Sequence, residues 1–202
     1  MTSKDVPRPA HGIVIRRAEI DEVDAVLESV WELTKISATA ARWSRSALYP
    51  YLATDEASGA LQAKAMFLAC ANPSTGANEP PAGDNPITTV DRLVGFAAFS
   101  AIMTVGAGES TLENMAVAKA LQRQGIGRRL LAAGLLWCRA HASAMVFLEV
   151  RKSNRAAITL YERAGFSAVG NRPGYYREPA EDGLQMQKSL GLVVPTIEIP
   201  SC

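Results

Sequence analysis

The 202-residue sequence lacks the features that mark several large classes of protein. Its charges are nearly balanced, with 21 Lys and Arg against 20 Asp and Glu, for a net charge of +1. Proteins that neutralise phosphates along a nucleic acid normally carry a marked basic excess, so no nucleic-acid partner is expected. No apolar stretch approaches the roughly 18 residues of a membrane-spanning helix, and no membrane role is expected either. The first residues also lack the apolar segment of a secretory signal.

Cysteine and histidine are scarce as well. Cys70, Cys138 and Cys202 form no C-x-x-C pair and no even-numbered disulfide framework, which indicates a reducing, cytoplasmic environment. The sequence has only two histidines, and no cluster of residues has the spacing of metal ligands. We therefore expect no metal site.

The composition that remains is that of one globular domain. Hydrophobic residues make up 48% of the chain and charged residues 20%, unlike the polar, highly charged profile of disorder. We expect residues 13–190 to form the domain, with residues 1–12 and 191–202 as tails. Residues 72–91 are rich in Pro, Gly, Asn, Ser and Thr and cannot bury a core, so they are expected to form a mobile insertion loop.

Hydrophobic periodicity predicts an α/β sandwich in which helices flank a mixed sheet. Hairpin-like strands come first, and helices then alternate with strands. Asp21 is the expected N-cap of the first helix, and Gly165 has the place of a left-handed residue after the last helix. Strands are expected at 13–18, 66–70, 93–102, 111–117, 146–150 and 184–188, and helices at 21–33, 44–48, 125–140 and 154–164.

A glycine-punctuated segment follows the strand that ends in Met115, Ala116 and Val117. It reads Gln122-Arg123-Gln124-Gly125-Ile126-Gly127-Arg128, a Q-x-x-G-x-G pattern at the start of a helix. Glycines let the backbone approach a ligand closely, and the first N–H groups of a helix bind phosphate oxygens well. The pattern equally suits an ordinary tight turn between strand and helix. It is neither a dinucleotide fingerprint nor a P-loop.

Three residues further along the chain are candidates for chemistry. Glu149 is the only charged residue in the apolar strand 146–150, where a carboxylate is costly unless it is partnered or wet. A simple ion pair with Arg151 or Lys152 would also account for it. Asn154 and Tyr161 are seven residues apart and so share one helix face, although a buried core tyrosine is the commoner case.

Together the two segments resemble the GCN5-related N-acetyltransferase (GNAT) superfamily. The strand, the Q-x-x-G-x-G loop and the helix match its acetyl-CoA pyrophosphate motif, and Glu149-Val150, Ser153-Asn154, Leu160-Tyr161 and Gly165-Phe166 match the motif that follows. The resemblance implies the GNAT fold, a mixed and mostly antiparallel sheet of about six to seven strands with about four helices. It implies acetyl-CoA as co-substrate.

A narrower similarity, over roughly residues 13–190, is to bacterial ribosomal-protein-alanine N-acetyltransferases. Arg172, Tyr175-Tyr176, Glu181-Asp182 and Trp43-Ser44 extend it beyond the two motifs. The insertion at 72–91, Pro173-Gly174 and both tails depart from the pattern. The departures concern the acceptor substrate more than the use of acetyl-CoA.

The resemblance implies a role for each candidate. Glu149 would act as general base through water, Tyr161 would donate a proton to the departing sulfur, and Asn154 would hydrogen-bond the CoA arm. Met115, Ala116 and Val117 would offer backbone contacts, and the segment Arg123, Gln124, Gly125, Ile126, Gly127 and Arg128 would bind the pyrophosphate. No covalent acyl-enzyme is implied.

Other residues receive weaker assignments. Glu113 is a reserve candidate for the base, and Cys138 is expected to be a buried residue rather than a nucleophile. His11 and His141 are expected on the solvent side. Trp43 and Tyr175-Tyr176 either shape a groove for the acceptor peptide or serve packing.

The expected function is acetyl transfer to the N-terminal alanine amine of a ribosomal protein, by direct attack. Two alternatives remain: a GNAT enzyme acting on another protein or small-molecule amine, and a non-catalytic acetyl-CoA sensor. Intact Glu149 and Tyr161 speak against the sensor, which needs no acid and base.

Overall fold

A computed structural model describes residues 12–36, 43–52, 62–71, 93–103 and 107–191. The predicted insertion at 72–91 lies outside these residues. So do the predicted tails, except for their innermost residues, Gly12 and Gly191.

The described chain is built on one seven-stranded sheet in the order β1-β2-β3-β4-β5-β7-β6. Every neighbouring pair is antiparallel except β4 and β5, which run parallel. The expected mixed, mostly antiparallel sheet is confirmed. The strands are β1 (Ile13–Arg17), β2 (Gln62–Ala71), β3 (Leu93–Ile102), β4 (Gly108–Val117), β5 (Ser143–Arg151), β6 (Ser167–Arg177) and β7 (Ala180–Ser189).

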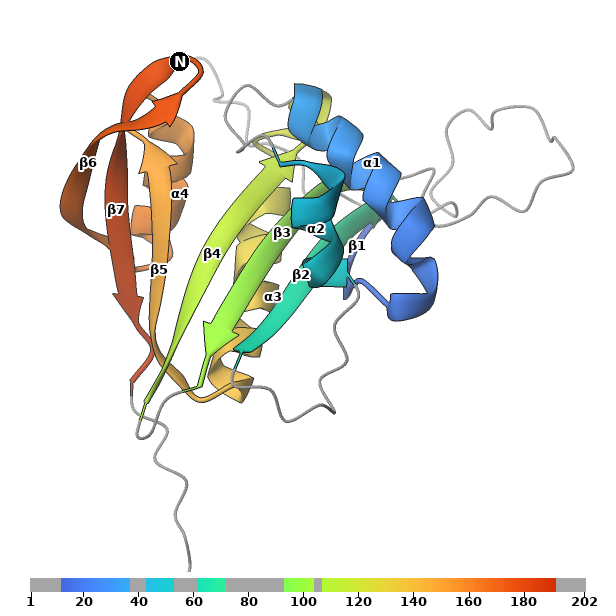
Figure 1. The fold of residues 1–202 in the computed structure, drawn as a ribbon, viewed down its shortest axis with the longest axis horizontal. Coiled ribbons are helices and arrows are strands. Elements are labelled where there is room, and N and C mark those ends of the chain that lie inside the picture. Colours follow the sequence, from blue (N-terminus) through green and yellow to red (C-terminus); the bar gives the residue numbers. More distant parts are fainter. Residues whose placement is uncertain (1–11, 37–42, 53–61, 72–92, 104–106, 192–202) are drawn as a thin grey trace, which may run out of the picture.

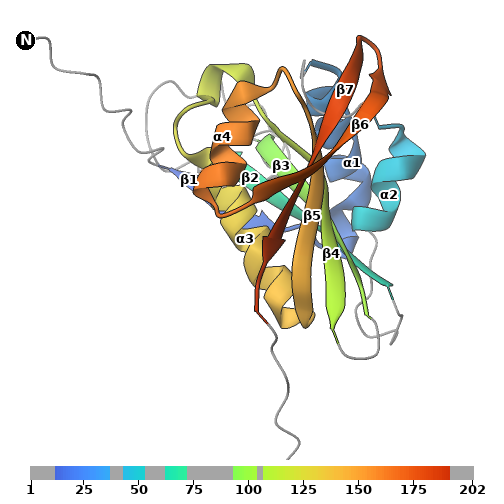
Figure 2. The ribbon, with the colours of Figure 1, turned by 90° about the vertical axis from the view of Figure 1, so that its left-hand side faces the viewer.

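Helices cover both faces of the sheet. Figure 1 shows α1 and α2 in front of the strands and α3 and α4 behind them, and Figure 2 shows the strands running between the two pairs. Each pair encloses its own apolar core, because the sheet separates them. The helices are α1 (Val23–Ile36), α2 (Arg45–Leu52), α3 (Ile126–Ala140) and α4 (Arg155–Arg163), with short 3-10 helices η1 (Ile20–Glu22) and η4 (Lys119–Leu121).

The start of the first helix differs from the prediction. Asp21 lies inside η1 rather than at an N-cap, and the cap is Glu19. Glu22 accepts a hydrogen bond from the Glu19 amide at 2.9 Å and is also held by Arg16 on β1. A capping box therefore starts this segment two residues earlier than expected.

One strand, β6, was absent from the predicted set. Its side chains are almost all exposed, because β6 forms the edge of the sheet. Pro173 and Gly174 interrupt its pairing with β7, so no apolar alternation marks it in the sequence. Proline is tolerated here because an edge strand has an unpaired side.

The parallel pair β4 and β5 opens into a fork. The strands pair from Gly108 to Leu112 on β4 and from Ser143 to Leu148 on β5. Beyond these residues β4 pairs only with β3, and β5 only with β7. Figure 1 shows the two strands parting toward one end of the sheet. The fork exposes one backbone edge of β4 in the interior of the domain.

A β-bulge in β4 lies where the fork begins. The register with β3 slips between Leu112 and Asn114, which leaves Glu113 as an extra residue. Leu112 packs in the core beneath α3, whereas Ala116, four residues later, packs in the core beneath α1 and α2. Residues four apart in a regular strand share one face. The bulge at Glu113 therefore reverses which face of the sheet the alternate side chains of β4 point to.

Among the described helices, none has the length and apolar character needed to cross a bilayer.

Candidate functional site

The fork leads into one large groove of about 1780 Å³. Its walls come from β4, the segment before α3, the end of β5 and the first turns of α4. All residues of the predicted catalytic and cofactor-binding set line it: Met115, Ala116, Val117, Arg123, Gln124, Gly125, Ile126, Gly127, Arg128, Glu149, Asn154 and Tyr161. Residues from two separate stretches of sequence are thus brought to a single cavity.

The start of α3 has the geometry of an anion site. Arg123 and Gly125 both have positive φ, 65° and 84°, and Gly125 is the left-handed N-cap of the helix. A Cβ on Gly125 would point into open space. No side chain caps the helix, so its first N–H groups remain available to a ligand. Gln122 fixes the loop by donating to the Val117 carbonyl at 3.1 Å.

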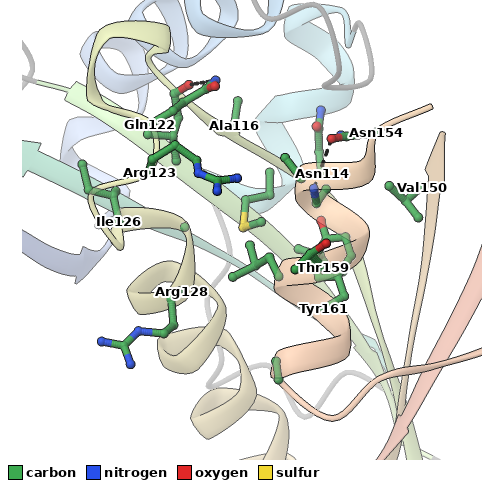
Figure 3. Close-up of a pocket in the computed structure, with 18 of the residues that line it drawn as sticks. Asn114, Ala116, Gln122, Arg123, Ile126, Arg128, Val150, Asn154, Thr159 and Tyr161 are labelled. Carbon is green, nitrogen blue, oxygen red and sulfur yellow. Dashed lines mark hydrogen bonds between the residues drawn. The ribbon is translucent and has the colours of Figure 1, made fainter. Parts of the chain in front are cut away.

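The two arginines of this segment lie differently. In Figure 3 the Arg123 side chain extends into the space between α3 and α4, whereas that of Arg128 extends away from α4. Both are exposed. Of the two, Arg123 is better placed to meet an anion at the helix start.

The first turn of α4 supplies Asn154. Its Oδ1 accepts a hydrogen bond from the Ala157 amide at 3.2 Å, so it serves as the helix N-cap. Its Nδ2 group donates to no other described residue, which leaves two donors at the groove. Capping and ligand binding are therefore compatible for this side chain.

Tyr161 lies two turns further along the same face of α4. Its side chain is buried in the core, as the packing interpretation expects, and it also lines the groove, while its catalytic role stays a prediction. Burial, with a smaller contribution from Tyr176, raises the pKa of Tyr161 above its ordinary value of 10.0. The phenol therefore stays protonated at neutral pH and can act as a hydrogen-bond donor.

Glu149 is the first residue of β5 beyond its pairing with β4. Its Oε1 accepts a hydrogen bond from Arg172 Nη1 at 3.0 Å. The expected alternative, a pair with Arg151 or Lys152, is wrong. Arg151 binds Glu181 and Lys152 binds Asp182, because both side chains are turned toward the β6–β7 hairpin.

Arg151 anchors that hairpin to the groove. Its guanidinium donates to the Glu178 carbonyl at 2.8 Å and to the Pro179 carbonyl at 3.0 Å. It also stacks on the Tyr176 ring at 4.2 Å, and Tyr176 lines the groove. Buried charged groups need such partners, so Arg151 holds this wall in place.

On the other side of the fork, Glu113 accepts a hydrogen bond from Ser100 Oγ at 2.7 Å. Burial raises the pKa of Tyr51 on α2, and the charge of Glu113 raises it further. Burial also raises the pKa of Tyr175 on β6, where the charges of Glu149 and Glu113 act in the same direction. Glu113 thus lies near side chains of both walls.

The aromatic residues expected near an acceptor form two pairs. Trp43 packs on Tyr51 with ring centroids 4.9 Å apart, and Tyr175 meets Tyr176 edge to face at 5.0 Å. These pairs serve packing, and Tyr176 also lines the groove.

The remaining candidates have structural roles. Cys138 is buried in the α3 core as expected, and burial raises the pKa of its thiol to about 11. His141 bonds the Trp137 carbonyl at 2.9 Å, and His11 lies outside the described residues. Within the described ranges, no three His, Cys, Asp or Glu side chains gather as a metal site.

The sequence did not single out Asn114. This polar side chain is buried on β4 directly after the bulge, and it lines the groove. A buried asparagine in an otherwise alternating strand is the signal that could have identified it. The hydrogen bond between Ser100 and Glu113 was also missed, because it depends on strand register.

Comparison with known proteins shows which family the groove-forming segment resembles. Residues 73–166 match the model of the Acetyltransferase (GNAT) family. The matched segment includes the start of α3, Glu149, Asn154 and Tyr161. It ends before β6 and β7.

Two curated relatives match a similar part of the chain. "N-alpha-acetyltransferase RimI" of Mycobacterium tuberculosis is 39% identical over 99 residues, 49% of this chain and 61% of the relative. The "[Ribosomal protein bS18]-alanine N-acetyltransferase" of Escherichia coli is 47% identical over 88 residues, 44% of this chain and 57% of the relative. The chain thus spans about three fifths of the length of these relatives.

Solved structures match over most of the chain. The ribosomal-protein-S18-alanine N-acetyltransferase of Escherichia coli superposes with a TM-score of 0.61 at 23% identity, over 93% of this chain and 99% of that one. Arabidopsis thaliana NAA60, solved in complex with acetyl-CoA, gives a TM-score of 0.67 at 14% identity, over 88% and 98%. At such identities these matches show a shared fold. The segment 73–166, which supplies most of the groove, is similar in sequence to the acetyltransferase (GNAT) family.

Proposed function

We propose that this protein transfers the acetyl group of acetyl-CoA to the N-terminal alanine amine of a ribosomal protein, by direct attack of the amine. The observation that carries the proposal is that Glu149 and Tyr161 line one groove, which also contains the uncapped start of α3. Acetyl transfer needs a proton acceptor for the amine and a donor for the sulfur. Relatives named for this reaction support the choice of acceptor.

The groove fits acetyl-CoA as the co-substrate. The N–H groups at the start of α3 and the Arg123 guanidinium suit a pyrophosphate, and the left-handed turn at Gly125 keeps side-chain atoms out of the way. The edge of β4 at Met115 and Ala116, which no second strand pairs, and the Asn154 amide suit the amides of the pantetheine arm. The acetyl thioester supplies the carbonyl carbon that the amine attacks.

Glu149 and Tyr161 divide the proton transfers. Glu149 takes the proton of the acceptor's ammonium through a water, from a place at the base of the fork. Tyr161 remains protonated because burial raises its pKa, and it donates a hydrogen bond to the sulfur as negative charge develops there.

The acceptor side of the groove lies toward the β6–β7 hairpin. Tyr176 lines the groove there and packs edge to face on Tyr175, and an aromatic wall with a polar tip suits an extended peptide. The balanced net charge of +1 suits a protein that meets its acceptor as a free cytoplasmic chain rather than on ribosomal RNA.

Two alternatives differ from this proposal in their chemistry. A GNAT enzyme for side-chain or small-molecule amines would use the same groove with another acceptor. A non-catalytic acetyl-CoA sensor would bind the cofactor without turnover, and the acid–base pair of Glu149 and Tyr161 argues against it.

A panel of acceptors distinguishes the three. The purified protein is incubated with acetyl-CoA and one of three acceptors: an Ala-initiated peptide, the same peptide N-blocked with an internal lysine, or spermine. Mass spectrometry then locates the acetyl group. Acetylation confined to the N-terminal amine supports the proposal. Transfer confined to lysine or spermine would contradict the proposal and support an enzyme for side-chain or small-molecule amines. Binding of acetyl-CoA with no turnover would favour the sensor.

A further inference from the structure

Arg172 contacts the carboxylate of Glu149 from a distant part of the sheet. Arg172 lies on β6 and Glu149 on β5, and β7 runs between them. The Arg172 Nη1 atom nevertheless donates to Glu149 Oε1 at 3.0 Å, so the side chain crosses the intervening strand. Arg172 pairs in register with Gly183 of β7, which has no side chain to block this path.

The local backbone aims Arg172 toward the fork. Pairing of β6 with β7 is interrupted between Arg172 and Tyr176. Within the interruption Gly174 adopts a φ of 62°, and its amide donates to Asp182 Oδ1 at 3.0 Å. The irregularity folds Tyr175 back over Gly183, where an added Cβ would lie 3.2 Å from the Tyr175 ring.

Tyr175 then supports the guanidinium. The Arg172 Cζ atom lies 4.1 Å from the centroid of the Tyr175 ring. Stacking on an aromatic face restricts the planar guanidinium to a narrow range of orientations. Arg172 is therefore held from one side by Tyr175 and directed at Glu149 on the other.

Arg172 contacts Glu149 through a single hydrogen bond rather than a bidentate pair. Arginine–carboxylate pairs are often bidentate, with both carboxylate oxygens engaged. Here Oε1 alone accepts from Arg172, and Oε2 accepts from no other described residue. The carboxylate is thereby held at one oxygen while the other stays available.

The pair is too exposed to serve mainly as a folding contact. The side chains of Arg172 and Glu149 are 45% and 25% exposed. Ion pairs at such exposure contribute little to stability, because water screens them. The built support around Arg172 therefore points to orientation of Glu149 rather than to strength of the fold.

We propose that Arg172 is a positioning residue for Glu149, which holds Oε1 so that Oε2 faces the acceptor amine or its bridging water. This inference rests on the proposed acetyl transfer and on the role of Glu149 in it. Arg172 itself touches neither the acetyl group nor the amine.

Kinetics of Arg172→Gln, Arg172→Lys and Glu149→Gln, alone and combined, test the proposal. Because misplacement of a reacting group by about 1 Å can cost up to about 100-fold, Arg172→Gln should lower kcat about 10- to 100-fold. The KM for acetyl-CoA should stay within about twofold, since the residues at the start of α3 are untouched. Arg172→Lys, which keeps the cation, should recover part of the loss. Arg177→Gln, on the same exposed strand, is the matched control.

The double variant is the decisive measurement. If Arg172 acts through Glu149, adding Arg172→Gln to Glu149→Gln causes no further loss of kcat. Losses that multiply would overturn the proposal, and so would an unchanged kcat in Arg172→Gln.

A crystal structure of the Arg172→Gln variant shows where the Glu149 carboxylate lies, and this measurement does not depend on activity. We expect the Glu149 carboxylate to move or to occupy several rotamers. A carboxylate that stays where it is would overturn the proposal even in an active enzyme. If the wild-type protein acetylates no acceptor, the proposed function fails, and this structure still decides whether Arg172 positions Glu149.

Discussion

Glu113 and Glu149 occupy matching places on neighbouring strands. Each directly follows the last residue of the β4–β5 pairing, Leu112 on one strand and Leu148 on the other. Both line the groove, but Glu113 is bound by the neutral Ser100 and Glu149 by the cationic Arg172. The fork therefore offers two carboxylates to an amine, and substitution can tell them apart.

Glu149→Gln should retain acetyl-CoA binding and lose turnover. A general base typically contributes about 100- to 10,000-fold, so kcat should fall by at least about 100-fold. Glu113→Gln should cost less, because Ser100 can still donate to the amide oxygen. Steady-state kinetics and calorimetric titration with acetyl-CoA give the two quantities. Glu162→Gln, an exposed glutamate of α4 outside the groove, is the control. A larger loss in Glu113→Gln would assign the base to Glu113.

Tyr161→Phe should bind acetyl-CoA with little change and slow the chemical step. The substitution removes only the hydroxyl and keeps the buried ring, so the fold should be preserved. We expect kcat to fall about 100-fold, within the range of a lost proton or hydrogen-bond donor. Single-turnover kinetics isolate this step. Tyr49→Phe, at an exposed tyrosine on α2, should match wild type. An undiminished rate in Tyr161→Phe would remove Tyr161 from the mechanism.

Stability should fall at alkaline pH. Burial raises the pKa of Tyr161 in the folded state, and it raises the pKa of Tyr176 to about 12. Above the unfolded pKa of about 10, the unfolded chain binds fewer protons than the folded one, so unfolding becomes easier as pH rises. One such group contributes a slope of about 1.4 kcal/mol per pH unit. Thermal melts between pH 9 and 11.5 should decline less steeply for Tyr161→Phe than for Tyr49→Phe. Identical slopes would contradict the buried, neutral phenol.

Gly125→Ala should weaken acetyl-CoA binding more than it weakens the fold. Its φ of 84° is left-handed, which costs an alanine about 1–2 kcal/mol, although no atom obstructs the new Cβ. Relief of this strain would shift the N–H groups at the start of α3. Titration with acetyl-CoA and thermal melts report the two effects. Gly191→Ala repeats the left-handed strain outside the groove and should leave affinity unchanged. Equal affinities in both variants would argue against an anion site at α3.

Gly134→Ala should destabilise the domain although it lies in a helix. Replacing glycine by alanine within a helix ordinarily stabilises by roughly 0.5–1 kcal/mol. Here the new Cβ would lie 2.0 Å from the ring of Phe99, which is fully buried and cannot move aside. Overpacking of this kind costs about 1–3 kcal/mol. Urea denaturation should show the loss, and Phe99→Leu in the same chain should restore part of it. A more stable Gly134→Ala would contradict the close approach of α3 to β3.

The sequence predicted those elements whose signal is local. The start of α3 at Gly125, the start of α4 after Asn154 and the left-handed Gly165 are each set by a few neighbouring residues, and all three occur as expected. The buried central strand β5 follows likewise from its apolar run. Capping and burial pattern both act within one or two turns of chain.

Features that depend on register were not predictable. The bulge at Glu113 arises from the register in which β4 pairs with β3, and no nearby residue type in the sequence indicates it. The partner of Glu149 lies 23 residues away across another strand, so nearer cations were the natural but wrong expectation. Strand β6 is exposed and paired on one side only, and its ladder with β7, rather than any apolar pattern, keeps it in the sheet.

The fork also bears on how selective the groove can be. Beyond Leu112 the peptide groups on one side of β4 face the opening instead of another strand. A peptide-like ligand laid along them can be bound in the manner of an added strand, through main-chain atoms alone. Such binding does not depend on which side chains β4 carries. Substitutions in β4 can therefore change which acceptor is bound, while the main-chain hydrogen bonds to an amide-bearing co-substrate are kept. The specificity for the acceptor and the specificity for the co-substrate can thus evolve separately.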